Sequence, residues 1–174
     1  LVSYIAAVTG MRYAEVAGIT RDAIDFSNQT ISINKTWDYK YRTGFKKTKT
    51  AASVRIVTVD TNTISVLKQY LSFNSVDDFR PIFLVNHRIL VSTQINQVLK
   101  SKLKELNLPA ITFHALRHTH ASVLLYKGVS VLSVSKRLGH SNVTTTQSTY
   151  LHIIKELEAQ DQSQIIKIIG LVDH

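Results

Sequence analysis

The period of the hydrophobic pattern changes once along this chain, and that change constrains the fold more than any other feature of the sequence. In residues 28–37 apolar and polar side chains alternate, as at Ile31 and Ile33, which is typical of a half-buried strand, and residues 54–59 form a second expected strand. Elsewhere, apolar residues recur at helical spacing. The clearest helical segments are 62–71, 93–106, 113–128, 130–140 and 144–160. The sequence therefore predicts a single mixed α+β domain, mostly α-helical, with a small antiparallel sheet of about three strands in its N-terminal half.

The charge of the chain is unusually positive. Its 174 residues carry a formal net charge of +9, and the sequence pI is about 9.8. A surplus of this size in a small domain predicts binding to a polyanion, with nucleic acid first and an anionic membrane surface second, although a merely soluble basic protein would have the same composition. The chain has no cysteine, which excludes disulfides and cysteine–zinc sites, and its apolar stretches are too short to cross a bilayer.

A basic segment lies between the two expected strands. Residues 35–55 hold seven Lys and Arg residues but one acidic residue, Asp38. Four aromatic residues are interleaved with them: Trp37, Tyr39, Tyr41 and Phe45. Positive charge combined with aromatic rings is typical of a nucleic-acid-binding edge. The alternative is a solvated, flexible hairpin with a chance excess of charge, but solvated faces usually mix both signs.

The stretch FHALRHTHASVL, residues 113–124, places three histidines and an arginine within seven residues. In a helix His114 and His118 lie one turn apart, as zinc-binding pairs do, but Arg117 would repel a dication and the stretch has no acidic residue. An anion site accounts for the same residues, because a guanidinium can donate two hydrogen bonds to a phosphate and an imidazole can donate a third. Solvated surface side chains are the third interpretation, which this stretch alone favours. We expect His118 and His120 at the helix surface or in packing.

Four more short motifs complete an ordered set. They are TGMRYAEV with Arg12, TKTAASVR with Lys49, RLGHSN with His140 and TTTQSTYLH with Tyr150. Together with HALRHTHAS, and in this order from Thr9 to about His152, these motifs resemble the tyrosine recombinase (phage integrase) family. Each string is weak by itself, but five in the family's order and with reasonable spacing make a specific signal.

The resemblance implies a role for each matched residue. Arg12 and Arg117 would clamp one DNA phosphate, and His114 and His140 would contact the same phosphate. Tyr150 would be the nucleophile that forms a 3′-phosphotyrosyl link and releases a 5′-hydroxyl. The residue types suit this chemistry, because charge that develops on phosphate oxygens needs cations nearby and a phenol can form a reversible ester.

The family's hairpin lysine acts as the general acid that protonates the leaving 5′-oxygen. Lys46, Lys47 and Lys49 compete for this role. We favour Lys49, because KTAASVR places it just before the outgoing strand, and Lys47 is the runner-up. Glu15 matches an acidic position of the family, and we interpret it as structural support for Arg12. The residues expected to contact DNA outside the reaction centre are Lys46, Lys47, Arg42 and Arg137.

The resemblance also implies an organisation for the protein. Residues 1–174 would form one catalytic domain, and residues 152–174 would be a C-terminal tail that docks on a neighbouring subunit. A family member normally carries an N-terminal core-DNA-binding domain, and nothing in this chain matches it. The expected partners are double-stranded DNA, three further copies in a homotetramer on two DNA sites, and an accessory excision or DNA-bending protein. We expect no membrane contact, no cofactor, no metal at the site and a cytoplasmic location.

The expected function is site-specific DNA cleavage and rejoining, independent of metal and ATP, that integrates or excises a mobile element. Three alternatives stay open: a type IB topoisomerase-like enzyme that relaxes DNA with the same chemistry, a non-catalytic basic DNA-binding module, and a histidine metal-dependent nuclease. The full set of matched residues argues against the binding module, and insensitivity to a chelator would argue against the nuclease.

Overall fold

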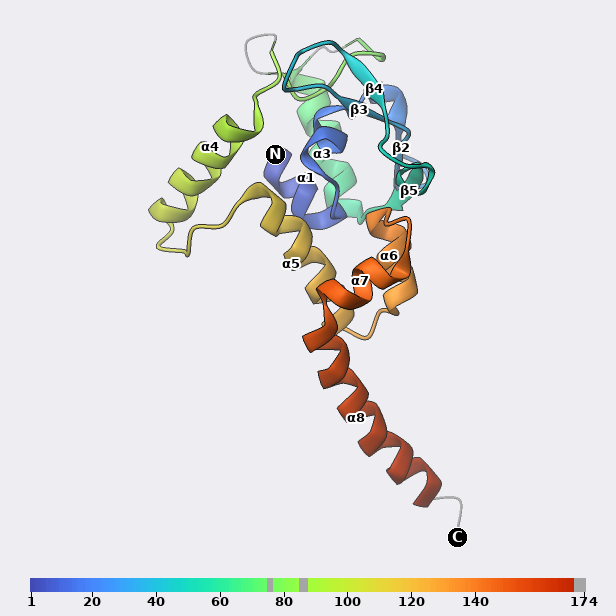
Figure 1. Ribbon diagram of the computed structural model, residues 1–174. Coiled ribbons are helices and arrows are strands. Elements are labelled where there is room, and N and C mark those ends of the chain that lie inside the picture. Colours follow the sequence, from blue (N-terminus) through green and yellow to red (C-terminus); the bar gives the residue numbers. More distant parts are fainter. Residues whose placement is uncertain (75–76, 85–87, 171–174) are drawn as a thin grey trace.

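The computed structural model describes residues 1–74, 77–84 and 88–170. Helices surround a small sheet at one end of the molecule, and one long helix extends away from the other end (Figure 1). The α-helices are α1 (Val2–Thr9), α2 (Tyr13–Ala17), α3 (Thr61–Phe73), α4 (Ser92–Glu105), α5 (Phe113–Tyr126), α6 (Val131–Leu138), α7 (Val143–Thr149) and α8 (Leu151–Gly170). Two 3-10 turns, η1 (Arg21–Ala23) and η2 (Ala51–Ser53), lie among the strands. The predicted mostly helical α+β fold is confirmed.

The three-stranded sheet is antiparallel and has the order β1-β2-β5. Its strands are β1 (Ile24–Asp25), β2 (Thr30–Ile33) and β5 (Arg55–Thr58). A separate two-stranded ribbon, β3 (Lys35–Trp37) and β4 (Phe45–Lys47), carries the basic hairpin and lies at the same end of the molecule (Figure 1). The small sheet predicted from the sequence is confirmed, and the hairpin forms a ribbon of its own beside it.

Two hydrophobic clusters stabilise the domain. The larger cluster packs α1, α2 and α3 against the sheet, and each large side chain that it buries contributes roughly 1.5 to 3 kcal/mol. Its fully buried members include Ile5, Met11, Ile31, Ile33, Val57 and Leu67. The smaller cluster lies where α5, α6 and α7 meet, and its buried members are Ala121, Leu125, Val134, Leu138 and Tyr150. The candidate nucleophile is therefore a core residue of the smaller cluster.

Helix α5 connects the two clusters and carries the whole motif HALRHTHAS. Its first residue, Phe113, packs in the larger cluster, and Leu125 near its end packs in the smaller one. The hydroxyl oxygen of Thr112 caps the helix by accepting a hydrogen bond from the backbone N–H of Ala115 at 3.2 Å. Because α1 packs along α5, the glycine turn after α1 is brought to the middle of this helix.

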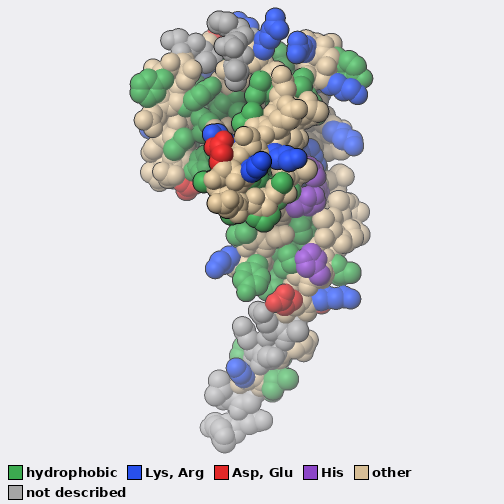
Figure 2. Space-filling view, turned by 90° about the vertical axis from the view of Figure 1, so that its left-hand side faces the viewer, with side chains coloured by type: hydrophobic (Ala, Val, Ile, Leu, Met, Phe, Trp, Pro, Cys, Tyr) green, Lys and Arg blue, Asp and Glu red, His purple; other side chains and the backbone are tan. Residues whose placement is uncertain are grey.

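Helix α8 leaves the body of the domain and extends into solvent (Figure 1). Its first turn packs on the smaller cluster through Ile153, whereas Ile165, Ile166, Ile168 and Ile169 near its end are exposed. In the space-filling view, Lys and Arg side chains gather at the top of the molecule, the end where the β3–β4 ribbon lies (Figure 2). Within the described part of the chain, none of the helices has the length and apolar character needed to cross a membrane.

Candidate active site

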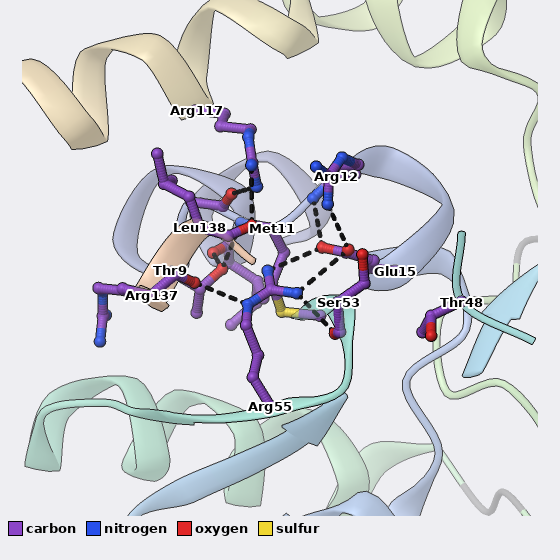
Figure 3. A network of polar contacts seen from close by, with 12 residues as sticks. Thr9, Met11, Arg12, Glu15, Thr48, Ser53, Arg55, Arg117, Arg137 and Leu138 are labelled. Atoms are coloured by element: carbon purple, nitrogen blue, oxygen red, sulfur yellow. Dashed lines mark hydrogen bonds and ion pairs between the residues drawn. The ribbon is translucent and has the colours of Figure 1, made fainter. Parts of the chain in front are cut away.

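A buried carboxylate organises the first part of the site. Arg12 directly precedes α2, and both its backbone N–H and its Nη1 donate to the Glu15 carboxylate, at 2.8 Å and 3.0 Å. Arg55 on β5 donates to the same carboxylate from Nη2 at 2.9 Å and from Nη1 at 3.2 Å (Figure 3). Burial by itself would raise the pKa of Glu15, but the hydrogen bonds and charges of Arg55 and then Arg12 outweigh it and hold this pKa below its ordinary value. Glu15 is therefore an anion that fixes two arginines, consistent with its predicted supporting role.

Arg55 joins three elements, and sequence reasoning gave it no role. Its Nε donates to the carbonyl of Arg137 near the end of α6 at 2.7 Å, and its Nη1 donates to the carbonyl of Ser53 at 3.0 Å (Figure 3). Gly139, next to this contact, has a φ of 70°, which favours glycine, and a Cβ there would lie 2.9 Å from Nη1 of Arg55 and 3.0 Å from the carbonyl oxygen of Ala52. The sequence feature that could have indicated the inward position of Arg55 was that it comes two residues before the buried Val57, which places both on the same face of the strand.

Arg117 on α5 is almost fully buried, with 4% of its surface exposed. Its Nη1 donates to the carbonyl of Gly10 at 2.7 Å, and its Nη2 donates to the carbonyl of Leu138 at 2.8 Å. Both carbonyls are at helix ends, where the backbone oxygens have no partner in the helix. Burial, and then the charge of Arg12, lower the pKa of Arg117 to about 10, so the guanidinium stays charged at neutral pH. Arg12 and Arg117 thus come from different elements and lie close enough to repel each other (Figure 3).

The phenol of Tyr150 lies in the same neighbourhood. Tyr150 ends α7, 3% of its surface is exposed, and its hydroxyl is 3.0 Å from Nδ1 of His118. Burial raises the pKa of Tyr150, and the positive charge of Arg117 partly opposes that shift. The structure therefore brings Arg12, Arg117 and Tyr150 together, although 138 positions separate the first from the last.

The two histidines predicted to contact phosphate lie beside the arginines. His140 follows α6, and its Nδ1 is 2.8 Å from the hydroxyl of Thr146. Burial, followed by the charges of Arg117 and Arg12, lowers the pKa of His140 to about 4. Burial, then His118 and then these arginines, also lowers the pKa of His114 on the first turn of α5. Both imidazoles are therefore neutral at neutral pH and can offer a phosphate an N–H donor without a full charge.

His118 and His120 have different environments, although the sequence predicts surface or packing roles for both. His120 packs between elements: its Nδ1 is 2.9 Å from the carbonyl of Ala7, and its Nε2 accepts a hydrogen bond from Nε of Arg137 at 2.9 Å. His118 instead contacts the phenol of Tyr150, and its ring lies 4.8 Å from that of His114 in an edge-to-face arrangement. The sequence feature that could have placed His118 at the site was its spacing of four residues from His114, because that spacing puts both on one helix face.

The predicted DNA contacts differ in how free their side chains are. Arg137 donates from its other two nitrogens to the carbonyls of Thr58 and Val8, at 3.1 Å and 3.0 Å, so its contacts are internal and argue against the predicted DNA contact. Lys46 pairs with Asp38 at 2.6 Å, which supports the hairpin. The other two predicted DNA contacts are exposed, Arg42 in the turn between β3 and β4 and Lys47 on β4. Lys49, the predicted general acid, is exposed in the segment that follows β4. Among the residues that the structure describes, no group of three or more His, Asp and Glu side chains is placed to hold a metal ion.

Comparison with known proteins assigns the family. The model of the group described as "Phage integrase family" matches residues 1–156. The chain belongs to the phage integrase family. This assignment agrees with the resemblance in the ordered motifs.

Curated phage integrase relatives cover nearly the whole chain. The integrase of Staphylococcus phage L54a is 30% identical over 179 residues, which covers 95% of this chain and 51% of the relative. A tyrosine recombinase XerC-like protein of Caldanaerobacter subterraneus subsp. tengcongensis is 31% identical over 169 residues, covering 84% of this chain and 43% of the relative. This chain spans about half the length of the curated relatives that it matches.

Solved structures show the same fold. The Tn1549 transposon integrase in complex with transposon right-end DNA has a TM-score of 0.74 at 24% identity, covering 85% of this chain and 52% of that one. The XerA recombinase has a TM-score of 0.69 at 23% identity, covering 90% of this chain and 55% of that one. This phage integrase family member therefore shares its fold with part of these two proteins.

Proposed function

We propose that this chain is the catalytic domain of a tyrosine recombinase that cleaves and rejoins DNA at specific sites during the integration or excision of a mobile element. One observation carries the proposal: the hydroxyl of the buried Tyr150 is 3.0 Å from His118, the residue next to Arg117 on α5, and Arg117 and Arg12 lie in one cluster of polar side chains (Figure 3). A phosphate held by the two arginines would be within reach of a nucleophile from the same subunit. The integrase of phage L54a and the DNA-bound Tn1549 integrase support the same class of substrate.

The two guanidinium groups suit the phosphate-clamping role. The two hydrogen bonds of Arg117 to backbone carbonyls use two of its five N–H groups, so three remain for phosphate oxygens. The side chain of Arg12 is 35% exposed and can reach a bound phosphate while Glu15 holds it. Because both cations are fixed before DNA binds, they stabilise the charge of the transition state without reorganising.

We assign the remaining roles from the family resemblance. His114 and His140 would donate to the phosphate, and Tyr150 Oη would form the bond to phosphorus. Lys49, exposed in the turn after β4, would protonate the departing 5′-oxygen, because an alkoxide leaves poorly without a proton. The phosphotyrosyl ester keeps the energy of the broken bond, so a 5′-hydroxyl from a partner strand can reverse the link without ATP.

The proposed assembly is a homotetramer on two double-stranded DNA sites, joined by an accessory excision or DNA-bending protein. The tail, residues 152–174, would dock on a neighbouring subunit. Its exposed isoleucines and its extension away from the body support this proposal, because an exposed apolar helix end gains stability by covering that surface (Figure 1).

The function is tested by trapping the covalent intermediate. The full-length protein is incubated with a library of DNA duplexes that each carry one nick, so that cleavage near the nick releases a short strand and prevents rejoining. DNA that stays bound to the protein after denaturation is recovered and sequenced. We expect a sequence-specific adduct that forms equally well in chelator and is lost in Tyr150→Phe.

The matched control is Tyr126→Phe, which changes an exposed tyrosine elsewhere on the domain and should leave the adduct intact. An adduct that persists in Tyr150→Phe would contradict the nucleophile assignment. Reversible binding without any adduct from the unaltered protein would instead support a non-catalytic DNA-binding module.

A further inference from the structure

The hydrogen bond between His118 and Tyr150 gives the nucleophile a partner that the roles above leave unused. Nδ1 of His118 is 3.0 Å from the phenol oxygen, which is within the range required of a general base. The two side chains are 32 residues apart and come from α5 and the end of α7. Tyr150 is 3% exposed, so this contact is made where water has little access to the phenol.

A phenol in this environment needs a base. Burial raises the pKa of Tyr150, so the resting hydroxyl is protonated and donates its hydrogen. Nδ1 of His118 accepts that hydrogen when the imidazole proton is on Nε2. Oη must lose this proton as it attacks, because a neutral phenol is a poor nucleophile.

Other candidate bases near the site have other partners. Both oxygens of the Glu15 carboxylate accept hydrogen bonds from Arg12 and Arg55, which lower its pKa and its proton affinity. Nδ1 of His140 is hydrogen-bonded to the hydroxyl of Thr146. His118 is the imidazole that touches the phenol.

We propose that His118 is a catalytic residue that orients the Tyr150 hydroxyl and accepts its proton when Oη attacks the DNA phosphate. This inference rests on the proposed recombinase function and adds the nucleophile's base to it. In the step, the bond between Oη and phosphorus forms with an oxygen electron pair, and the phenol proton moves to Nδ1 of His118. The bond between phosphorus and the 5′-oxygen breaks, and that oxygen leaves with its electron pair and a proton from Lys49. Rejoining reverses every transfer, so no oxidant, reductant or other reactant is consumed.

Three titratable groups face the imidazole of His118. They are His114 on α5, His140 after α6 and Tyr150 after α7, with the charge of Arg117 acting on the phenol. A DNA phosphate would add negative charge to this group and favour the protonated imidazole that forms in the step.

The test measures single-turnover formation of the covalent adduct on the trapped DNA sequence, using the full-length protein. His118→Ala should bind DNA with unchanged affinity and lower the rate by roughly 10²-fold or more, the usual contribution of a general base. Imidazole added in solution should restore part of that rate. His118→Asn places a polar atom near the position of Nδ1 but cannot take the proton, so it should stay slow at neutral pH and accelerate as pH rises. His152→Ala, an exposed histidine two residues after the nucleophile, is the matched control.

The outcomes separate the two proposals. If the unaltered protein forms an adduct that requires Tyr150 and His118→Ala forms it at the same rate, only the role of His118 is overturned. If His118→Asn restores the full rate at neutral pH, the residue holds the phenol without accepting its proton, and the base assignment is overturned. If the unaltered protein forms no adduct on any trapped duplex, both the recombinase function and this inference are overturned.

Discussion

At the scale of single residues, burial sets the protonation states of the site. It raises the pKa of Tyr150, lowers that of His140 to about 4 and leaves Arg117, with a pKa of about 10, still charged. The resting site at neutral pH therefore holds a neutral phenol and neutral imidazole beside fixed positive charge. In the proposed function, such a site would attract a phosphate before the nucleophile is activated, so DNA binding and proton transfer would be separable steps.

The choice between the hairpin lysines is the prediction at this scale. Lys49→Ala should slow cleavage of an ordinary phosphodiester by roughly 10²-fold or more, because the 5′-oxygen loses its proton donor. It should cleave a substrate with sulfur in place of the bridging 5′-oxygen at close to the normal rate, because a thiol, with a pKa of about 8.5, leaves without a proton. Single-turnover cleavage of both substrates measures this difference.

Lys47→Ala is the matched comparison, since Lys47 is exposed on β4 two residues away. It should weaken DNA binding at low salt and affect both substrates equally. Selective recovery on the sulfur substrate by Lys47→Ala, in place of Lys49→Ala, would transfer the general-acid role to Lys47.

At the scale of elements, one carboxylate fixes the positions of α2, β5 and α6 relative to one another. Glu15 connects the start of α2, through Arg12, to β5, through Arg55, and Arg55 continues the connection to the end of α6. Side chains of Glu15 and Arg55 are 2% and 7% exposed, so their pair is shielded from solvent. Removing one partner of such a pair leaves an uncompensated buried charge, which costs more than the pair itself contributes.

We therefore predict that Glu15→Gln destabilises the domain by about 3 to 5 kcal/mol, measured by urea unfolding monitored by circular dichroism. Cleavage should fall as well, because Arg12 loses its support. Glu105→Gln, which removes the exposed Lys102–Glu105 pair, is the control and should change stability little. A Glu15→Gln protein as stable as the unaltered one would show that the two arginines do not depend on this carboxylate.

At the scale of the whole molecule, the proposed nucleophile and the proposed phosphate clamp belong to different hydrophobic clusters. Arg12 lies next to the larger cluster, Tyr150 lies in the smaller one, and α5 spans both. The site therefore forms where two packed units meet, and α8 leaves the smaller unit directly after the nucleophile (Figure 1). Because α8 begins at the residue after Tyr150, a contact between α8 and another subunit could shift the position of Tyr150.

We predict that truncation after Gln160 separates cleavage from recombination. The full-length protein that lacks only the residues after Gln160 should still form the covalent adduct on a nicked duplex, because the described site residues all precede α8. It should lose strand exchange between two DNA sites, because the exposed isoleucines that would dock on a neighbour are removed. Gel assays of adduct and of recombinant product measure the two activities in parallel, and undiminished recombination would rule out the docking role.

Much of the fold follows from short-range patterns. The alternation around Ile31 and Ile33 predicts a strand, because neighbouring strand residues face opposite sides of a sheet. The spacing of apolar residues in 113–128 predicts α5, because residues three or four positions apart share one face of a helix. Gly10, with a φ of 70°, ends α1 as the TGMR turn predicts. The separate pairing of β3 and β4 was not predictable, because pairing depends on which strands are adjacent in space.

The candidate site also has features that the sequence predicted and features that it did not. Order and spacing of the motifs identified Arg12, Arg117, His114, His140 and Tyr150 as candidates, since a family pattern is a property of the sequence itself. The sequence did not reveal that Arg55 shares the carboxylate of Glu15 or that the guanidinium of Arg137 is used internally. Whether a basic side chain faces DNA or a carbonyl depends on the helix ends packed against it.

The sequence by itself thus determined the family, the mostly helical α+β architecture and the set of residues from which a DNA-cleaving site could be built. Only the tertiary structure decided that His118, among the histidines that the structure describes, contacts the phenol of Tyr150. The physical reason is range: helix and strand periodicity depend on neighbours a few residues apart, whereas a 3.0 Å contact across 32 residues exists only after α5 and α7 have packed around one core.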